Sequence, residues 1–408
     1  MSSNIFELDD QLTYMRPAVS VSGEQNFVSF KPSEAAPFTS NQSFSINVNS
    51  TTAFIDPTKM WLKYKLRLTG GTSAGSSTIS ASGGAMVIKS VTTNVGGLQV
   101  ERINNYNQYV SVQHKRGTGE NTNLLKDLEC VASTTALTVD ANYANGRYIV
   151  HALKNCITQQ QQLVPLPYIR GGIRFEFQLD TINNAVLSLA TSTDFEVSDV
   201  QLICSMISPS DDYMKSFQSS LENGKTASIQ TVITNSYQTS LNATTQQSVD
   251  ILCGFVQSLK SITFTQRAST SLNSSTVDAF NNDTHDKLKS WYLSVGSSRY
   301  PQNFYISTTN VNSLGVIDPT SLALVNGKGN YASIDSKVAY TTSTDCVNSY
   351  RFGSNSFGAG AQVSDGKLTL SLEYNSAPTT GNQVDVFLQS DALIEIGAGG
   401  IILNQKSL

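Results

Sequence analysis

The chain has 408 residues, a length that suits two domains of about 200 residues better than one core. Only 14% of the residues are charged, well below the roughly 25% of an average globular protein, and Ser, Thr, Asn and Gln take their place. The net charge of −4 and the lack of a Lys/Arg run argue against nucleic-acid binding as the main task, because neutralising phosphates needs clustered cations.

The polar surface and the cysteines point to a protein that packs against other protein in a reducing compartment. A surface with few charges suits side-by-side packing, because little charge must be desolvated at each contact. The first ten residues lack the basic region and apolar core of a signal peptide, and no apolar run approaches the ~20 residues that span a bilayer. The five cysteines are scattered and form no C-x-x-C, which argues against disulfides and zinc: Cys130, Cys156, Cys204, Cys253 and Cys346.

The N-terminal segment, residues 1–40, is predicted to be an extended arm. It is irregular and contains three prolines, and Phe27, Phe30 and Phe38 give it apolar anchors that a disordered tail would lack. The first strand is expected at residues 44–48, where apolar and polar residues alternate as in a half-buried strand.

Residues 61–68 are predicted to form a strand with one cationic face. Lys63, Lys65 and Arg67 alternate with apolar residues, and a period of two segregates these cations fully, whereas helical spacing would scatter them. We interpret them as a solvated outer face; a phosphate surface or an acidic neighbour is the alternative. A flexible Gly/Ser/Thr-rich loop follows at residues 69–84.

The rest of the first half is predicted to hold strands and two helices. Strands are expected at residues 86–103 (broken by a turn at Gly96-Gly97), 148–153, 163–179 and 195–207, and helices at 104–115 and 122–131. Pro165 and Pro167 restrict their run to an edge or entry position, because proline cannot donate to a sheet.

A capped helix is predicted at the midpoint of the chain, residues 209–225. Ser208 and Pro209 supply a cap and a first-turn proline, and an Asn-Gly pair ends the helix. Asp211 and Asp212 are adjacent, so on a helix their side chains point about 100° apart and do not form a paired-carboxylate site. We interpret them as first-turn anions that interact favourably with the helix dipole. We interpret this helix as the link between two domains.

The second half is predicted to be a second β-unit. Strands are expected at residues 227–241, 249–264, 291–306 (with a turn at Gly296), 368–372, 384–388 and 393–396; residues 401–403 should dock as a last apolar run, and long polar segments occupy 267–286 and 307–350. The fold class predicted is mainly β, with two tandem eight-stranded jelly rolls (a double jelly roll) and a few short helices: a first roll at 41–208 and a second at 226–408.

No pattern of catalytic or metal-binding residues is present. His114, His151 and His285 have no partner at metal-ligand spacing, and no P-loop, G-x-S-x-G or H-E-x-x-H occurs. His114 is interpreted as a solvated helix end. We therefore expect no catalytic, cofactor or metal site. Carboxylates such as Glu176 and Glu373 lie on expected strands, where distant residues could meet as the pair that a β-rich glycosidase needs, but no pair stands out.

The two halves repeat one pattern. Gly-led alternating strands occur at residues 171–179 and 365–372, each followed by a second strand, and Asn94-Val95-Gly96-Gly97 has a counterpart in Ser294-Val295-Gly296-Ser297. Two similar β-units in one chain indicate a building block rather than a catalyst built around a pocket.

These residues resemble the double-jelly-roll major capsid proteins of tailless icosahedral double-stranded DNA viruses, the lineage of tectivirus-like phages, polinton-like viruses, virophages and adenoviruses. The resemblance is carried by the run at residues 163–168 leading into 171–176, by 91–109 and 294–301, and by the ending at 368–374, 384–388 and 397–403.

The resemblance implies a homotrimer whose six jelly rolls form a pseudo-hexagonal capsomer of an icosahedral virion shell, assembled in the host cytoplasm or nucleus. The partners that it implies are neighbouring capsomers, penton proteins and minor capsid proteins, and in some relatives an underlying membrane. It also implies that the N-terminal arm ties neighbouring subunits together. It implies no catalytic residue and no cofactor. A carbohydrate-binding or adhesin-like β-sandwich is the alternative, opposed by the missing signal peptide and only two tryptophans. A β-rich enzyme such as a glycosidase is a third hypothesis.

Overall fold

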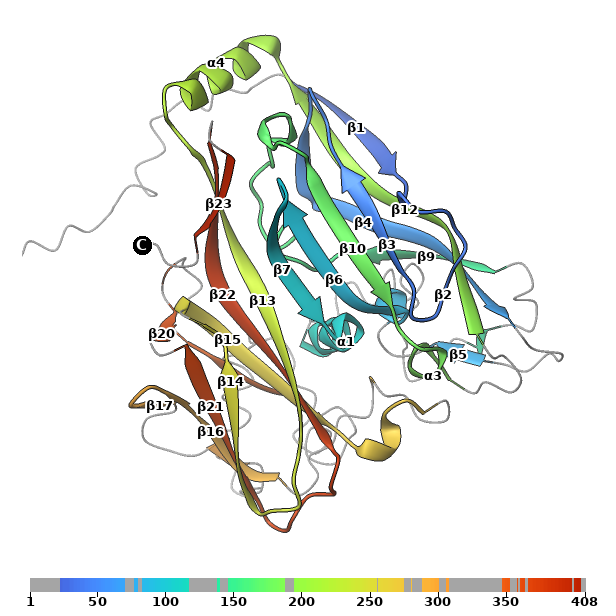
Figure 1. Ribbon diagram of the computed structural model, residues 1–408, viewed down its shortest axis with the longest axis vertical. Coiled ribbons are helices and arrows are strands. Elements are labelled where there is room, and N and C mark those ends of the chain that lie inside the picture. The colour runs from blue at the N-terminus through green and yellow to red at the C-terminus, as the bar shows by residue number, and fades with distance from the viewer. Residues whose placement is uncertain are drawn as a thin grey trace, which may run out of the picture.

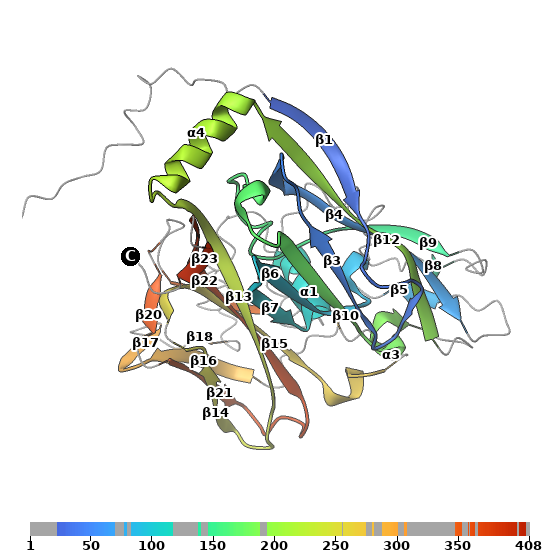
Figure 2. The same cartoon turned by 45° about the horizontal axis from the view of Figure 1, so that its top comes forward.

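The structure is a computed structural model. It describes residues 23–69, 77–79, 83–116, 138–139, 146–187, 194–254, 256–274, 280, 288–300, 306–307, 347–352, 358, 360–363, 366–397 and 400–404. In these residues the chain is mainly β and all strand pairs are antiparallel. Figures 1 and 2 show two β-units lying side by side, one blue to green and one yellow to red.

The first unit consists of two four-stranded sheets with small additions. One has the order β1 (Gly23–Phe30), β12 (Asp194–Pro209), β4 (Phe54–Thr69), β9 (Arg147–Ala152), with β2 (Phe38–Thr39) also on β12. The other has the order β3 (Ser43–Val48), β10 (Ile173–Leu179), β6 (Ile88–Val95), β7 (Leu98–Asn104). A small sheet joins β11 (Val186–Leu187), β5 (Ser77–Ile79) and β8 (Thr138–Val139).

The second unit repeats this arrangement. One sheet has the order β13 (Ala227–Ser240), β22 (Gln383–Gly397), β15 (Val256–Arg267), β19 (Val347–Arg351), with β20 (Ala361–Val363) on β15 and β23 (Gly400–Asn404) on β22. The other has the order β14 (Gln246–Leu252), β21 (Lys367–Tyr374), β16 (Leu288–Val295), β17 (Ser298–Tyr300), with β18 (Ile306–Ser307) on β16.

The two units have the same topology. When the eight main strands of each unit are numbered in chain order, both units have one sheet of order 1-8-3-6 and another of order 2-7-4-5. Eight antiparallel strands divided between two packed sheets form a jelly roll. The two units therefore confirm the predicted fold class. The repeated turn is also real: Gly96 and Gly296 have φ values of 57° and 55° at equivalent β-hairpins between the fourth and fifth strands.

Apolar residues bury themselves between the sheets of each roll and also between the rolls. The first core includes Ile46, Phe175 and many other residues of the first roll, and the second core surrounds Trp291. The first core continues into the second roll through buried residues of β13 and β22: Ile229, Ile233, Phe387, Ala392, Ile394 and Ile396. Burial at roughly 25 cal/mol per Å² of apolar surface therefore stabilises the joined rolls as well as each roll.

Few helices accompany the strands. The described α-helices are α1 (Tyr106–Arg116), α3 (Ile182–Ala185) and α4 (Asp211–Glu222), and short 3₁₀ turns lie at Gly83–Ala85, Leu166–Tyr168 and Ser269–Ser271. The helix predicted at 104–115 is confirmed as α1, while the one at 122–131 lies outside the described residues. In Figure 1, α4 bridges one end of the molecule between β12 and β13.

The start of the linking helix differs from the prediction. Its acidic first turn holds Asp211 and Asp212, as expected, but Ser210 is the N-cap residue and makes no side-chain capping bond. Pro209 is the last residue of β12, opposite Gly23 of β1, so its predicted place in the first helical turn is wrong. The strand continues to this point because β1 supplies a pairing partner.

Part of the predicted N-terminal arm is a strand. Residues 23–30 form β1 and pair with β12 over their whole length, so they belong to the first roll, although every one of them except Phe30 is exposed. The prediction failed because this strand lacks the buried alternation by which half-buried strands are detected. Residues 1–22 lie outside the described residues.

Several predicted strand bounds also change. Residues 163–172 form a bridge, a 3₁₀ turn and a glycine turn rather than a strand, because their prolines cannot donate to a ladder. The run 249–264 is divided into β14 and β15 at Gly254, whose φ is 69°, whereas 384–388 and 393–396 join in one strand, β22.

The predicted loops contain strands too. Residues 77–79 form β5 and 347–351 form β19, while most of 307–350 and much of 267–286 lie outside the described residues. The last apolar run docks as predicted, since β23 pairs with β22.

Candidate functional site: the contact between the two jelly rolls

The histidines singled out in the sequence lie in different settings. The Nε2 atom of His151, buried in β9, lies 2.9 Å from the Tyr106 hydroxyl, which in turn accepts a bond from the Lys154 amide at 2.8 Å. His114 is half-buried in α1 rather than at a solvated helix end, and His285 lies outside the described residues. In the part of the chain that the structure describes, no group of three or more His, Cys, Asp or Glu residues could hold a metal ion.

The cationic face of β4 is engaged by the first roll itself. The Lys63 and Lys65 amines lie 4.9 and 5.8 Å from the centroid of the Tyr148 ring, at distances typical of cation–π contacts. Arg67 forms an ion pair with Glu196 on the neighbouring strand. These contacts favour an ordinary outer face over a phosphate-binding surface.

The two strand carboxylates are not brought together as a pair. Glu176 lies on β10 in the first roll, where its Oε1 is 3.3 Å from Nε of Arg174. Glu373 lies on β21 in the second roll, where hydrogen bonds from Lys289 and Ser290 lower the pKa of its carboxyl. The two carboxylates therefore lie on sheets of different rolls, and each has its own basic partner.

The described cysteines are poor nucleophiles. Cys156 and Cys204 are buried and Cys253 is half-buried, all as free thiols. Burial raises the pKa of Cys204 to about 12, and it raises the pKa of the other two as well. Cys130 and Cys346 lie outside the described residues.

Helix α1 forms the centre of the contact between the rolls. It follows β7, the fifth strand of the first roll, and packs against the 1-8-3-6 sheet of the second roll. The Tyr109 ring lies 5.4 Å from that of Phe387, and the Gln108 amide donates to Thr265 at 3.1 Å. In Figure 1, α1 lies next to the lower ends of β6 and β7, on the side of the first roll toward the second. Its first seven residues are all buried. The sequence predicted one apolar face for this helix, and in the structure the other faces are also covered by protein.

A buried carboxylate holds both rolls beside α1. Glu101 on β7 is 2% exposed; its Oε2 accepts the amide of Cys156 in the first roll and its Oε1 the amide of Thr234 on β13, each at 2.7 Å. Burial outweighs these two hydrogen bonds and raises the pKa of Glu101 to about 7. We did not predict this residue, although period two places Glu101 on the same face as the apolar Ile103.

A second polar group closes the contact. In the second roll, Nε of Arg267 and Oδ2 of Asp385 are 2.6 Å apart, and both side chains are almost completely buried. Asn105, which precedes α1 in the first roll, donates to Asp385 Oδ1 at 3.2 Å, and Gln238 of β13 donates to the same oxygen at 3.0 Å. The pair is therefore satisfied by hydrogen bonds from both rolls, as a buried ion pair must be.

The contact is heterologous. The fifth strand and following helix of the first roll meet the first, third and eighth strands of the second roll, so two different sides of the same fold are used. Such an arrangement can be repeated by further copies, because each roll also possesses the side that its partner uses.

Comparisons with known proteins agree with this architecture. No protein-family model matches the sequence, and no curated protein is similar to it at a significant level. The fold is similar to that of VP54 of PBCV-1, fitted into a reconstruction of the virophage Sputnik, at 12% identity and a TM-score of 0.63, covering 94% of this chain and 97% of that one.

Two further structures are similar over comparable lengths. The Sputnik virophage structure has 10% identity and a TM-score of 0.61, with 99% of this chain and 92% of that chain covered. The Faustovirus major capsid protein has 8% identity and a TM-score of 0.56, with coverage of 94% and 92%. The chain thus has the double-jelly-roll fold expected from its sequence resemblance.

Proposed function

We propose that the chain is a major capsid protein, a structural subunit that trimerises into pseudo-hexagonal capsomers of an icosahedral virion shell. The observation that carries the proposal is the repeat of one eight-strand topology in two rolls, in a fold shared over 94% of the chain with a major capsid protein. The division into two roll domains linked by α4 is part of the same proposal. The role is structural rather than catalytic.

The contact within the chain supports a contact between chains. Inside the chain, the fifth-strand side of the first roll meets the first-strand side of the second. Between chains, the same kind of contact would use the fifth strand of the second roll, β17, in one subunit. This strand would meet β1, the first strand of the first roll, in the next subunit. A ring of three chains with six rolls closes when every roll meets its neighbours in this way, as the sequence resemblance implies.

The exposed state of β1 supports this arrangement. Phe27 and Val28 are 62% and 38% exposed, whereas the equivalent strand β13 buries Ile229 and Ile233. An edge strand that presents unpaired backbone groups and large apolar side chains invites pairing with another chain. A neighbouring subunit would cover it.

The proposal is tested by the mass of the purified protein in solution, by light scattering and native mass spectrometry. We expect a trimer for the native chain and a loss of trimers in Phe27→Lys, because a lysine at this place would be desolvated in the subunit contact. Leu252→Lys is the matched control, since Leu252 is 68% exposed at the end of β14 and away from β1. A native protein that stays monomeric at every salt concentration contradicts the proposal.

The place of the subunit in the cell follows from the same proposal. It belongs to the virion, assembled in the host cytoplasm or nucleus, with other capsomers, penton and minor capsid proteins as partners and a membrane beneath the shell in some relatives. Within the described residues, no helix is long and apolar enough to cross a membrane.

A further inference from the structure

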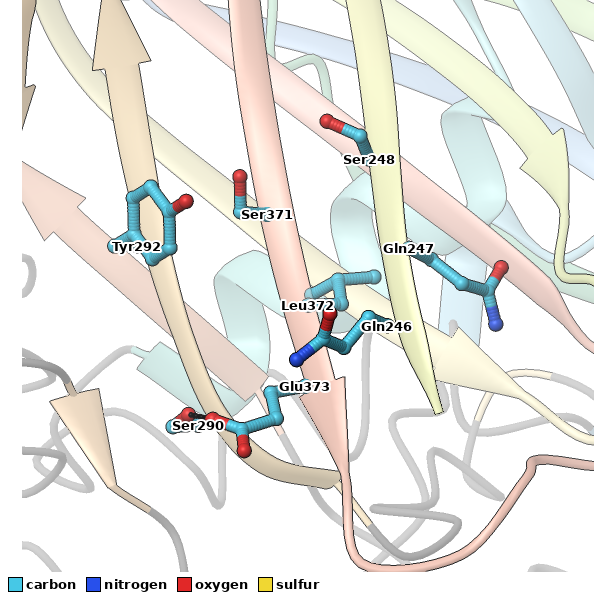
Figure 3. A pocket seen from close by; sticks show the side chains of 8 residues that line it. All are labelled: Gln246, Gln247, Ser248, Ser290, Tyr292, Ser371, Leu372 and Glu373. Carbon is cyan, nitrogen blue, oxygen red and sulfur yellow. Dashed lines mark hydrogen bonds between the residues drawn. The ribbon is translucent and has the colours of Figure 1, made fainter. Parts of the chain in front are cut away.

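The outer face of the 2-7-4-5 sheet in the second roll carries a polar hollow of about 350 Å³. Strand register places its lining side chains in two rows across β14, β21 and β16. The rows are Gln246, Glu373 and Ser290, and next to them Ser248, Ser371 and Tyr292. Figure 3 shows Ser371 between Ser248 on one side and Tyr292 on the other.

The hollow differs from the corresponding place in the first roll at its centre, where a serine stands in place of a glutamate. Register aligns Leu368, opposite Val295, with Ile173, opposite Val95, so Ser371 is the counterpart of Glu176 in the first roll. By the same alignment Tyr292 is the counterpart of Thr92. In the first roll Glu176 fills the middle of the sheet face and bonds Asn94 at 3.2 Å. In the second roll, Ser371 leaves the middle open beside Ser248, whose counterpart in the first roll is Ser45, and Tyr292 adds an aromatic wall.

The groups around the hollow offer unused hydrogen bonds. The side chains of Ser248, Ser371 and Gln246 form no hydrogen bond with any residue that the structure describes, so two hydroxyls and a carboxamide face the hollow with donors and acceptors to spare. The Tyr292 ring is steadied by Arg299, whose guanidinium lies 4.1 Å from the ring centroid.

The charges at this face are arranged in pairs. Glu373 is bonded by Lys289 at 2.6 Å and by Ser290 at 2.8 Å, and Asp250, one row beyond the hollow, is 2.9 Å from Lys367. A phosphate would meet the Glu373 carboxylate instead of a cluster of cations, and a metal ion would find a single carboxylate. An apolar ligand would leave the serine floor and Gln246 unpaired, which costs free energy.

We propose that this hollow binds a neutral saccharide. A sugar ring presents hydroxyls that both donate and accept, matching serine hydroxyls, a carboxamide and one carboxylate, and its apolar face suits contact with an aromatic wall. The shallow, open shape fits one or two terminal sugar residues of a larger glycan. Single-site affinity is expected to be weak, and many copies on one particle would raise the avidity.

The test is binding of the native, fully assembled protein to a printed array of neutral and acidic oligosaccharides. We expect signal on neutral glycans and a loss of at least tenfold in Ser371→Glu, which places in the hollow the residue that fills the first roll. Ser43→Glu is the matched control, because it adds the same side chain to an exposed position on the corresponding sheet face of the first roll and should leave binding unchanged.

On the array, three outcomes would overturn the proposal: no binding to any neutral glycan, binding to acidic glycans alone, or equal binding by Ser371→Glu and the native protein. Circular dichroism and particle mass are measured for each variant. A variant Ser371→Glu that folds but no longer assembles would show that the hollow is a contact between subunits, which also overturns saccharide binding. A trimer that binds no glycan leaves the capsid proposal intact, so the two proposals fail separately.

Discussion

The first jelly roll presents its fifth strand and helix α1 to the second roll, whereas the second roll presents its first and eighth strands, β13 and β22. The sides left over are β1 in the first roll and β17 in the second. The same topology therefore has a joined side, with buried charge and aromatic packing, and an open side, with exposed polar and apolar residues. Equivalent strands acquire different roles through their neighbours.

The two rolls also differ along their second strands. The outer edge of β3 is covered by the segment before it: the Ser33 amide donates to the Ser45 carbonyl at 2.9 Å, and the Glu34 carboxylate accepts the Ser45 amide at 2.7 Å. In the second roll only residues 241–245 connect β13 to β14, too few to run back along that edge. The length of one connection thus decides whether an edge strand is covered by its own chain.

Breaking the buried pair at the joined side should have the largest effect. Asp385→Ala leaves the Arg267 charge buried without its partner, and loss of one member of a buried pair costs about 3–5 kcal/mol. Chemical denaturation measures this loss. The control is Asp250→Asn, which removes an exposed ion pair with Lys367 on the outer sheet face of the second roll, away from the contact between the rolls, and should leave the midpoint unchanged. Equal losses in both variants would contradict the special role of the buried pair at the joined side.

Stability at the joined side should also depend on pH through Glu101. Its pKa is about 7 in the folded protein, against an ordinary value of 4.5 for the unfolded chain, so between these values the folded chain keeps a proton that the unfolded chain releases. The free energy of unfolding therefore falls as pH rises from 4.5 to 7, by about 3 kcal/mol, and the loss levels off above pH 7.

The Glu101 contribution is isolated by subtraction. Cys156 and Tyr109 also face this carboxylate, but the pKa of each is raised above its ordinary value, outside the window. The free energy of unfolding of the native protein and of Glu101→Gln is measured at pH 5 and at pH 7. Between these two values the native protein should lose stability relative to the variant, which cannot titrate at this position. A difference independent of pH would show that Glu101 does not titrate in this range.

The architecture was predictable from sequence because period-two alternation and repeated glycines report directly on strands and hairpins. Gly96 and Gly296 marked equivalent turns, and α1 was predicted within two residues of its bounds. What escaped prediction depends on pairing across the chain. Nothing local in residues 23–30 shows that β12 needs a partner, and Ser371 becomes the floor of a hollow only once register sets it beside Ser248 and Tyr292.

The smallest expected effect concerns the covered edge of β3. Partial burial raises the pKa of the Glu34 carboxyl, but the hydrogen bonds that the Ser45 amide and hydroxyl donate to it help to outweigh this, and the net pKa is lowered. Glu34→Gln should cost about 1 kcal/mol at pH 7, the net worth of a hydrogen bond. Because the folded pKa is depressed, this contribution is present above the unfolded value of 4.5 and is lost as pH falls through the folded pKa. Native and variant stabilities should therefore converge in acid. A gap that persists at low pH would show that the Glu34 side chain acts at this edge through its packing and not through its charge.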